Sequence, residues 1–336
     1  LMCAATIIES DPDVEIVLIE KNIMPDTYPS KDGLTQLENR LKQDLSWLDL
    51  PAKNWVIPRS KNDQLMIDVA IIGAGMAGMG AAAALRLLGI HAVLFDRAPQ
   101  GFEGPWATTA RMETLRSPKQ LTGPALGLPA LTFRAWFEAQ FGVQAWESLD
   151  KIPRMQWMDY LRWYRRVLNL DVRNEHYIRD VIPEQLGHVE LSMDTPTGRQ
   201  TIHSRRLIIA SGRDGLGGPY VPEFASALPR HLWAHSSDAI EASFFKDKRI
   251  GVVGAGASAM DSAATALEAG ASSVDLLIRR QDMPRINKGK GAGNAGLTHG
   301  HIDLPDEWKW RIRHYINSQQ VPAPRGSTLR VSKFTN

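Results

Sequence analysis

The stretch that decides the fold reads Asp68-Val-Ala-Ile-Ile-Gly73-Ala-Gly75-Met-Ala-Gly78. An apolar run of strand length leads into glycines spaced Gly-x-Gly-x-x-Gly, and an Ala- and Leu-rich run typical of a helix continues to residue 88. A second apolar run over 91–95 ends in Asp96, about 20 residues beyond the glycines. This order predicts a dinucleotide-binding unit with phosphates at the helix N-terminus. A glycine-rich helix start without a ligand is the alternative.

The same pattern recurs in Arg249-Ile-Gly-Val-Val-Gly254-Ala-Gly256-Ala-Ser-Ala259. Ala259 replaces the third glycine, which the pattern tolerates because only close helix packing is at stake. The next predicted strand, 274–278, ends in Arg279-Arg280 rather than in an acid. An acid accepts hydrogen bonds from ribose hydroxyls, whereas arginines suit the extra phosphate of NADP. The chain is therefore expected to hold two different dinucleotides, although a solvated arginine pair remains the alternative.

Composition excludes several classes of function. The net charge is only +2 and charged residues make up 23% of the 336 residues, which argues against nucleic-acid binding. Cys3 is the only cysteine, so no redox-active dithiol or internal disulfide can form in this chain. That excludes disulfide-reductase chemistry within the chain and agrees with a reducing compartment, so we expect the cytoplasm.

One apolar stretch has nearly the length of a membrane span. It covers 69–90, but it contains several glycines and Arg86, and the strand-turn-helix pattern explains the same residues. We therefore predict no membrane span.

Two further signals lie between the glycine patterns: Gly104-Pro-Trp106, and an apolar strand over 206–210 that ends in Ser211-Gly212. With these residues in place, the chain resembles the class B flavoprotein monooxygenases over roughly residues 68–280. The second glycine pattern with Asp261 is similar to that family's Gly-x-Gly-x-Ser-x-x-Asp form. The family's Phe-x-Gly-x-x-x-His signature is not matched in register by residues 228–236, so the subgroup stays open.

The resemblance implies FAD at the first glycine pattern and NADPH at the second. The residues implied to contact FAD are Gly73, Gly75, Gly78, Asp96, Arg97, Gly104, Trp106, Met112, Val181, Ser211 and Gly212. Those implied to contact NADPH are Gly254, Gly256, Ala257, Ser258, Ala259, Arg279 and Arg280. Arg111 is the catalytic candidate, stabilising negative charge on a peroxyflavin. A surface arginine on a helix is the alternative for Arg111, and no metal is expected.

In such an enzyme NADPH reduces the flavin, which reacts with O2 at its C4a position to form the peroxide that oxygenates a small organic substrate. Two alternatives remain open: a flavin-dependent NAD(P)H reductase or oxidase, and a catalytically inactive dinucleotide-binding protein. The expected partners are the substrate and O2, with no nucleic acid. Formation of a homo-oligomer is left open.

The expected fold class is α/β, with two Rossmann-like domains. The predicted divisions are an N-terminal extension over 1–67, an FAD domain over 68–225 and an NADPH domain over 226–336. The extension is expected to hold a partial strand-helix unit over 2–20, in which a helix precedes a strand and for which an extra edge strand is the alternative. A helix over 37–50 and a linker over 51–62 follow. Since few residues follow Arg280, we expect a fragment with an incomplete C-terminal return to the FAD domain.

An aromatic stripe marks the region between the two patterns. Trp157, Tyr160 and Tyr164 are three and four residues apart, as one face of a helix requires. Core packing is the favoured interpretation, and a substrate pocket is the alternative. The neighbouring Arg162, Arg165 and Arg166 predict that the other face of this helix is wet.

Overall fold

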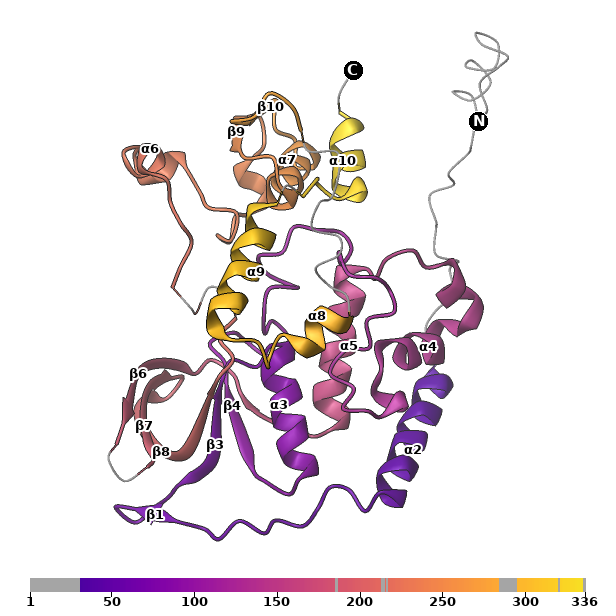
Figure 1. The fold of residues 1–336 in the computed structure, drawn as a ribbon, viewed down its shortest axis with the longest axis vertical. Helices are drawn as coiled ribbons and strands as arrows, with labels where there is room; N and C mark the ends of the chain where they lie inside the picture. Colours follow the sequence, from indigo (N-terminus) through magenta and orange to yellow (C-terminus); the bar gives the residue numbers. More distant parts are fainter. Residues whose placement is uncertain are drawn as a thin grey trace.

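The computed structural model describes residues 31–184, 187–212, 215, 217–283, 295–319 and 321–334. Its main feature is a six-stranded sheet in the order β5-β4-β3-β8-β7-β6 (Figure 1). The strands are β3 (Ile67–Ile72), β4 (Ala92–Phe95), β5 (Asp171–Arg173), β6 (Tyr177–Pro183), β7 (Val189–Thr195) and β8 (Gly198–Ile209). Strands β5, β4, β3 and β8 pair in parallel, whereas β8, β7 and β6 form an antiparallel meander.

The two faces of the sheet are covered by different partners. Val69 and Ile71 of β3 belong to a core shared with the helices, which are α2 (Lys31–Trp47), α3 (Met76–Leu87), α4 (Phe133–Ser148) and α5 (Arg154–Val167). Ala70 alternates to the other face, where it packs with Leu191 and Met193 of β7. The central strands β3 and β4 are thus buried on both sides, which explains why their sequences are almost continuously apolar.

The aromatic stripe is core. Trp157, Tyr160 and Tyr164 of α5 are fully buried among α2, α3 and α4. The Tyr160 hydroxyl donates to the Leu131 carbonyl at 2.6 Å, and the Tyr164 hydroxyl donates to the Pro124 carbonyl at 2.7 Å. Burial raises the pKa of both phenols, so they stay neutral hydrogen-bond donors. These contacts confirm the core-packing interpretation.

The prediction of a wet face on α5 is wrong for Arg165. Its guanidinium lies 2.6 Å from Glu103, whose side chain is only 5% exposed, and 2.9 Å from the Asn174 side-chain oxygen. The pair anchors the loop after β4 to the helix. Arg166 does lie on the surface, where it pairs with Glu38 of α2 at 2.6 Å.

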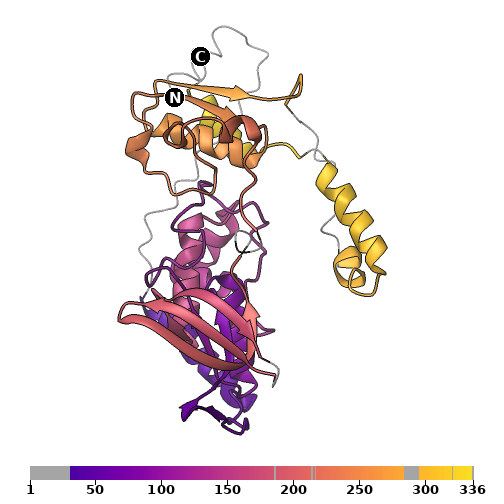
Figure 2. The same cartoon turned by 90° about the vertical axis from the view of Figure 1, so that its left-hand side faces the viewer.

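A second, smaller sheet contains the other glycine pattern. Strands β9 (Arg249–Val253) and β10 (Ser273–Leu277) pair in parallel, and α7 (Ala257–Glu268) connects them. Figure 2 shows α10 (Arg325–Ser332) beside α7, while α8 (Ala295–Gly300) and α9 (Asp306–Ser318) extend away. Shorter elements are the β1 (Ser60–Lys61) and β2 (Gln64–Leu65) hairpin, α6 (Glu223–Ser226), and the 3-10 turns η1 (Pro129–Leu131), η3 (Arg230–Leu232) and η4 (Ala242–Phe244).

These elements confirm the α/β fold class and the predicted strands and helices around both glycine patterns. The predicted helix over 37–50 is α2, which begins and ends earlier. The strand-helix unit predicted over 2–20 lies outside the described residues. The domain divisions at 67 and 225 stay predictions. Of the helices described between residues 31 and 334, none combines the length and apolar character that crossing a bilayer demands.

Candidate dinucleotide-binding site

The first glycine turn is closed by backbone contacts that leave no room for side chains. The Gly73 amide donates to the Phe95 carbonyl at 2.8 Å, which holds the end of β3 against β4. Gly73 has φ +99°, and a Cβ there would lie 2.5 Å from the Ala210 carbonyl oxygen. A Cβ on Gly78 would lie 1.9 Å from the Gly73 carbonyl oxygen. Both residues are therefore required by the fold of the turn itself.

Gly75 has a different role, because the space in front of it is open. It precedes α3 with φ −69°, and a Cβ there would meet nothing nearer than the Gly104 Cα at 3.9 Å. Two bare backbone segments thus face each other across a gap that a side chain would fill. No side chain caps the N-terminus of α3, so its first amides remain available as donors. This cradle fits a dinucleotide pyrophosphate.

Asp96 is fixed at the edge of this cradle. Its side chain is largely buried, and it accepts hydrogen bonds from the Ala74 amide at 2.7 Å and the Ala98 amide at 2.8 Å. Each carboxylate oxygen keeps a lone pair after these contacts. The carboxylate is consequently oriented beside the turn, where it could accept ribose hydroxyls.

The loop that carries Gly104, Trp106 and Met112 is held by Arg154, which the sequence did not reveal. From the start of α5, the Arg154 guanidinium donates to the Met112 carbonyl at 2.9 Å and also to the Trp106 carbonyl. Trp106 itself packs edge-on against Trp157, with ring centroids 6.4 Å apart. Arg154 therefore positions a loop whose flavin contacts stay a prediction.

Arg111 is engaged with the segment that leads to the second unit. Its guanidinium donates to the Asp238 carbonyl at 2.8 Å and also to the Ser236 carbonyl. Burial lowers the pKa of Arg111 from its usual value, and the nearby Asp238 opposes that shift. These hydrogen bonds connect the loop after β4 to the segment that precedes the second glycine turn. The catalytic role of Arg111 remains a prediction.

The other residues implied to contact FAD are spread over the sheet. Ser211 and Gly212 follow Ala210, whose amide donates to the Ile72 carbonyl at 2.8 Å, so both lie beside the first glycine turn. Arg97 is exposed directly after Asp96. Val181 lies on β6, with strands β8 and β7 between it and β3. The structure brings Ser211 and Gly212 to the turn and leaves Val181 at the far edge of the sheet.

The second glycine turn repeats the first. The Gly254 amide donates to the Leu277 carbonyl at 3.0 Å, as Gly73 does to Phe95. Gly256 precedes α7 with φ −87° and no side-chain cap, and a Cβ there would meet no atom within 4 Å. Ala257, Ser258 and Ala259 form the first turn of α7, so their amides lie at its N-terminus.

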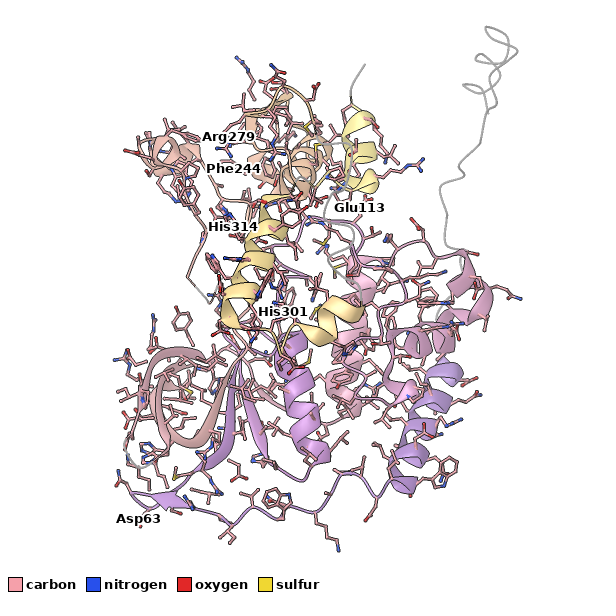
Figure 3. The ribbon with its side chains drawn as sticks, viewed as in Figure 1. Asp63, Glu113, Phe244, Arg279, His301 and His314 are labelled. Atoms are coloured by element: carbon pink, nitrogen blue, oxygen red, sulfur yellow. The ribbon has the colours of Figure 1, made fainter. Side chains whose placement is uncertain are left out.

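Arg279 and Arg280 are exposed just beyond β10, and Figure 3 labels Arg279. Because the Gly254 amide donates to Leu277 as the Gly73 amide donates to Phe95, Ile278 takes the place of Asp96, and Arg279 and Arg280 lie one and two residues beyond it. A phosphate-binding role for the arginines stays a prediction. Arg285, Lys288 and Lys290, the basic residues that follow them in the sequence, fall outside the described residues.

Asp261 of α7 forms a buried junction between three segments. It accepts a hydrogen bond from the Ser327 hydroxyl of α10 at 2.6 Å, and it lies 3.0 Å from Arg116 and 3.5 Å from Arg330. Arg330 also contacts Glu268 at 2.7 Å and donates to the Arg111 carbonyl at 2.9 Å. The aspartate of the second pattern thus joins the second unit to the loop after β4.

Comparison with known proteins identifies a family profile and a relative that match this chain. A family profile described as pyridine nucleotide-disulphide oxidoreductase matches residues 70–290. The FAD-dependent urate hydroxylase of Xanthomonas campestris pv. campestris is 44% identical over 303 residues, which is 89% of this chain and 63% of that protein. This chain therefore spans just under two thirds of the length of that relative.

Solved structures share the fold at low identity. Ornithine hydroxylase from Pseudomonas aeruginosa aligns with a TM-score of 0.65 at 16% identity, over 80% of this chain and 69% of that one. The cadaverine monooxygenase of Erwinia amylovora, solved with FAD, gives 0.60 at 16% identity over 80% of this chain and 65% of that one. Ornithine N-hydroxylase of Kutzneria sp. 744 gives 0.57 at 15% identity, over 80% and 67%. The flavoprotein resemblance inferred from the sequence is confirmed, and the chain belongs to the pyridine nucleotide-disulphide oxidoreductase family.

Proposed function

We propose that this chain is the dinucleotide-binding part of an FAD-dependent, NADPH-using monooxygenase that hydroxylates urate or a closely related purine. The observation that carries the proposal is the 44% identity to a urate hydroxylase over 89% of the chain. A segment of that length cannot be placed on 336 residues without including both glycine turns. The relationship therefore extends to the parts that would bind the cofactors.

The chain's own residues suit the binding of two dinucleotides. The bare backbone at Gly75 and Gly104 and the oriented carboxylate of Asp96 would hold FAD. The open turn at Gly256 with Arg279 and Arg280 would hold NADPH. When bound, the FAD passes electrons from NADPH to O2, so that one oxygen atom enters the substrate and the other leaves as water.

Disulfide reduction does not suit this chain, despite the family's name. That chemistry requires a pair of cysteines, and the sequence contains only Cys3. Electrons from the flavin would therefore pass to O2. The proposed partners are O2 and a small organic substrate, and the proposed location is the cytoplasm. Formation of a homo-oligomer stays a prediction.

The test is the stoichiometry of turnover in the full-length protein. The purified protein, loaded with FAD, is mixed with NADPH and urate in air. NADPH oxidation, O2 uptake, hydrogen peroxide release and urate loss are measured together. The proposal expects urate to accelerate NADPH oxidation, with one urate consumed per NADPH and little peroxide released.

Two outcomes would contradict the proposal. If each NADPH yields one hydrogen peroxide and no purine is consumed, the protein is an oxidase or reductase. If no flavin is retained and NADPH is not oxidised, it is a binding protein. A set of related purines, tested in parallel with urate, separates a wrong substrate from a wrong reaction.

A further inference from the structure

Three potential metal ligands converge where the turn between β6 and β7 meets β8. Glu184 and His188 flank this turn, and His203 lies on β8 directly opposite Glu190 of β7. The ligand atoms of Glu184, His188 and His203 all lie within 4.8 Å of one another. The two imidazole rings stand nearly perpendicular, at 84°, with their centroids 5.9 Å apart. Two histidines and one carboxylate are a donor set that zinc and other divalent transition metals bind.

One donor of this set is buried and unsatisfied. His203 is 8% exposed, and its Nδ1 atom has no hydrogen-bond partner among the described residues. A carboxylate oxygen of Glu190 lies 3.9 Å from this atom, which is too far for a hydrogen bond. A buried imidazole nitrogen without a partner costs free energy unless something occupies the space that it faces.

The contacts of His188 are also better suited to a metal ion than to hydrogen bonds. Its Nε2 atom lies 2.8 Å from a Glu184 carboxylate oxygen and 3.0 Å from the Lys61 ammonium nitrogen. If Nε2 carries a proton, it faces the ammonium donor; if it does not, its lone pair faces the carboxylate. Either protonation state leaves one close contact repulsive. A cation bound between these donors would satisfy both the imidazole and the carboxylate.

Lys61 supplies a positive charge to this cluster. It reaches in from the β1–β2 hairpin, and its ammonium contacts Glu184 as well as His188. The cluster therefore already attracts a cation, and the Lys61 ammonium contacts Glu184 and His188 while the Nδ1 atom of His203 keeps no hydrogen-bond partner among the described residues. Figure 3 places the hairpin, through the labelled Asp63, at the outer edge of the molecule. Lys61 belongs to neither hydrophobic core cluster, so its withdrawal toward solvent would leave the core packing in place.

We propose that Glu184, His188 and His203 form a binding site for a divalent transition-metal ion, best matched by Zn²⁺, which displaces the Lys61 ammonium. The three side chains leave a fourth coordination position for water or for Glu190. Lys61 and His188 also line a cleft of about 650 Å³, which gives an ion a path from solvent.

This site is separate from the dinucleotide turns. His203 precedes Ser204, which pairs with Ile67 at the start of β3, whereas the first glycine turn follows the end of β3. The two therefore lie at opposite ends of the same strands (Figure 1). A metal here would join the β6–β7 turn to β8, and its binding can be measured independently of flavin chemistry.

The test is metal binding to the purified full-length protein. The protein is stripped with a chelator, dialysed and incubated with ZnCl2, and bound zinc is measured by mass spectrometry after gel filtration. Affinity is measured by competition with a chromophoric chelator. The site predicts one zinc that is lost or weakened at least ~100-fold in both His188→Gln and His203→Gln, because loss of even a supporting residue can weaken metal binding ~10- to 100-fold.

Lys61→Met tests most directly whether zinc displaces the Lys61 ammonium from the site. It removes the competing ammonium, so zinc affinity should rise several-fold. His91→Gln is the matched control, since His91 lies outside the cluster, 3.5 Å from Asp171, and its loss should leave zinc binding unchanged. Zinc binding that is absent in the wild type, unchanged in His188→Gln, or weakened by Lys61→Met would overturn the proposal. Retained FAD confirms that each variant is folded.

Discussion

At the scale of single residues, substitutions of Gly75 and Gly78 are expected to affect different properties: cofactor binding for Gly75 and folding stability for Gly78. A methyl group at Gly75 meets only the Gly104 Cα at 3.9 Å, so the fold accepts Gly75→Ala, but the methyl fills the space proposed for the pyrophosphate. We expect the unfolding free energy of apo Gly75→Ala to lie within about 1 kcal/mol of the wild-type value. Its affinity for FAD should fall at least ~10-fold. Urea unfolding and flavin titration measure the two quantities.

Gly78→Ala is the matched comparison. Its methyl group would lie 1.9 Å from the Gly73 carbonyl oxygen, so the turn must distort. We expect a loss of about 1–3 kcal/mol or more in the unfolding free energy of the apo form. Equal stability of the two variants, or full FAD binding by Gly75→Ala, would contradict this account of the turn.

The sequence predicted these glycines because their spacing is dictated by local backbone geometry. It did not predict Arg154 or Arg330, which act on backbone carbonyls 42 and 219 residues away in the chain. Nothing in the neighbourhood of either arginine marks it, since the partner is created only by folding. The Glu184, His188 and His203 cluster was missed for the same reason, because its residues meet across a strand pairing rather than in a motif.

At the scale of the element, the packing of α10 against α7 depends on the ion pairs of Arg330. Arg330 is 6% exposed at its side chain and binds both carboxylate oxygens of Glu268, at 2.9 and 2.7 Å, while facing buried Asp261. Arg330→Met removes the guanidinium that pairs with the carboxylates of Glu268 and Asp261. We therefore expect the unfolding free energy to fall by about 3 kcal/mol and hydrogen exchange to become faster throughout α10. Arg325→Met, at an exposed position of the same helix, is the control and should change neither quantity.

Acid should weaken the same contact. The hydrogen bond from Arg330 holds the pKa of Glu268 below its usual 4.5, although partial burial opposes the shift. A carboxyl with a lowered pKa in the folded state stabilises above the unfolded pKa, and that contribution is lost as the pH falls through the folded pKa. The stability difference between wild type and Glu268→Gln should therefore be present at pH 6 and shrink as the pH falls below 4.5. A difference that is independent of pH would contradict the pairing.

Elements were easier to predict than their contacts. The pattern of apolar runs and glycines located β3, α3, β4, β9 and α7 closely, because strand and helix periodicities are local. The same patterns placed Arg165 on a wet face, although folding pairs it with the buried Glu103. An arginine is predicted to be exposed unless its acidic partner is known, and the partner of Arg165, Glu103, lies 62 residues away in the sequence.

At the scale of the whole molecule, side-chain contacts join the two glycine-turn units within the described residues. Arg111 binds the carbonyls of Ser236 and Asp238, and Arg116 lies 3.0 Å from Asp261. Both arginines belong to the loop after β4, the loop that also carries Gly104 and Trp106. The residues proposed to contact the flavin are thus physically continuous with those that hold the second unit in place.

The central claim is that the two turns hold different dinucleotides and that electrons pass from the second to the first. It is tested most directly by titrating the FAD-loaded full-length protein with NADPH and with NADH under anaerobic conditions, in wild type and in the Arg279→Ala, Arg280→Ala double variant. We predict flavin reduction by NADPH in wild type, and unchanged FAD content with about 10- to 100-fold weaker NADPH binding in the variant. NADH binding should stay the same. Flavin that NADPH does not reduce, or equal NADPH affinity in both proteins, would contradict the account.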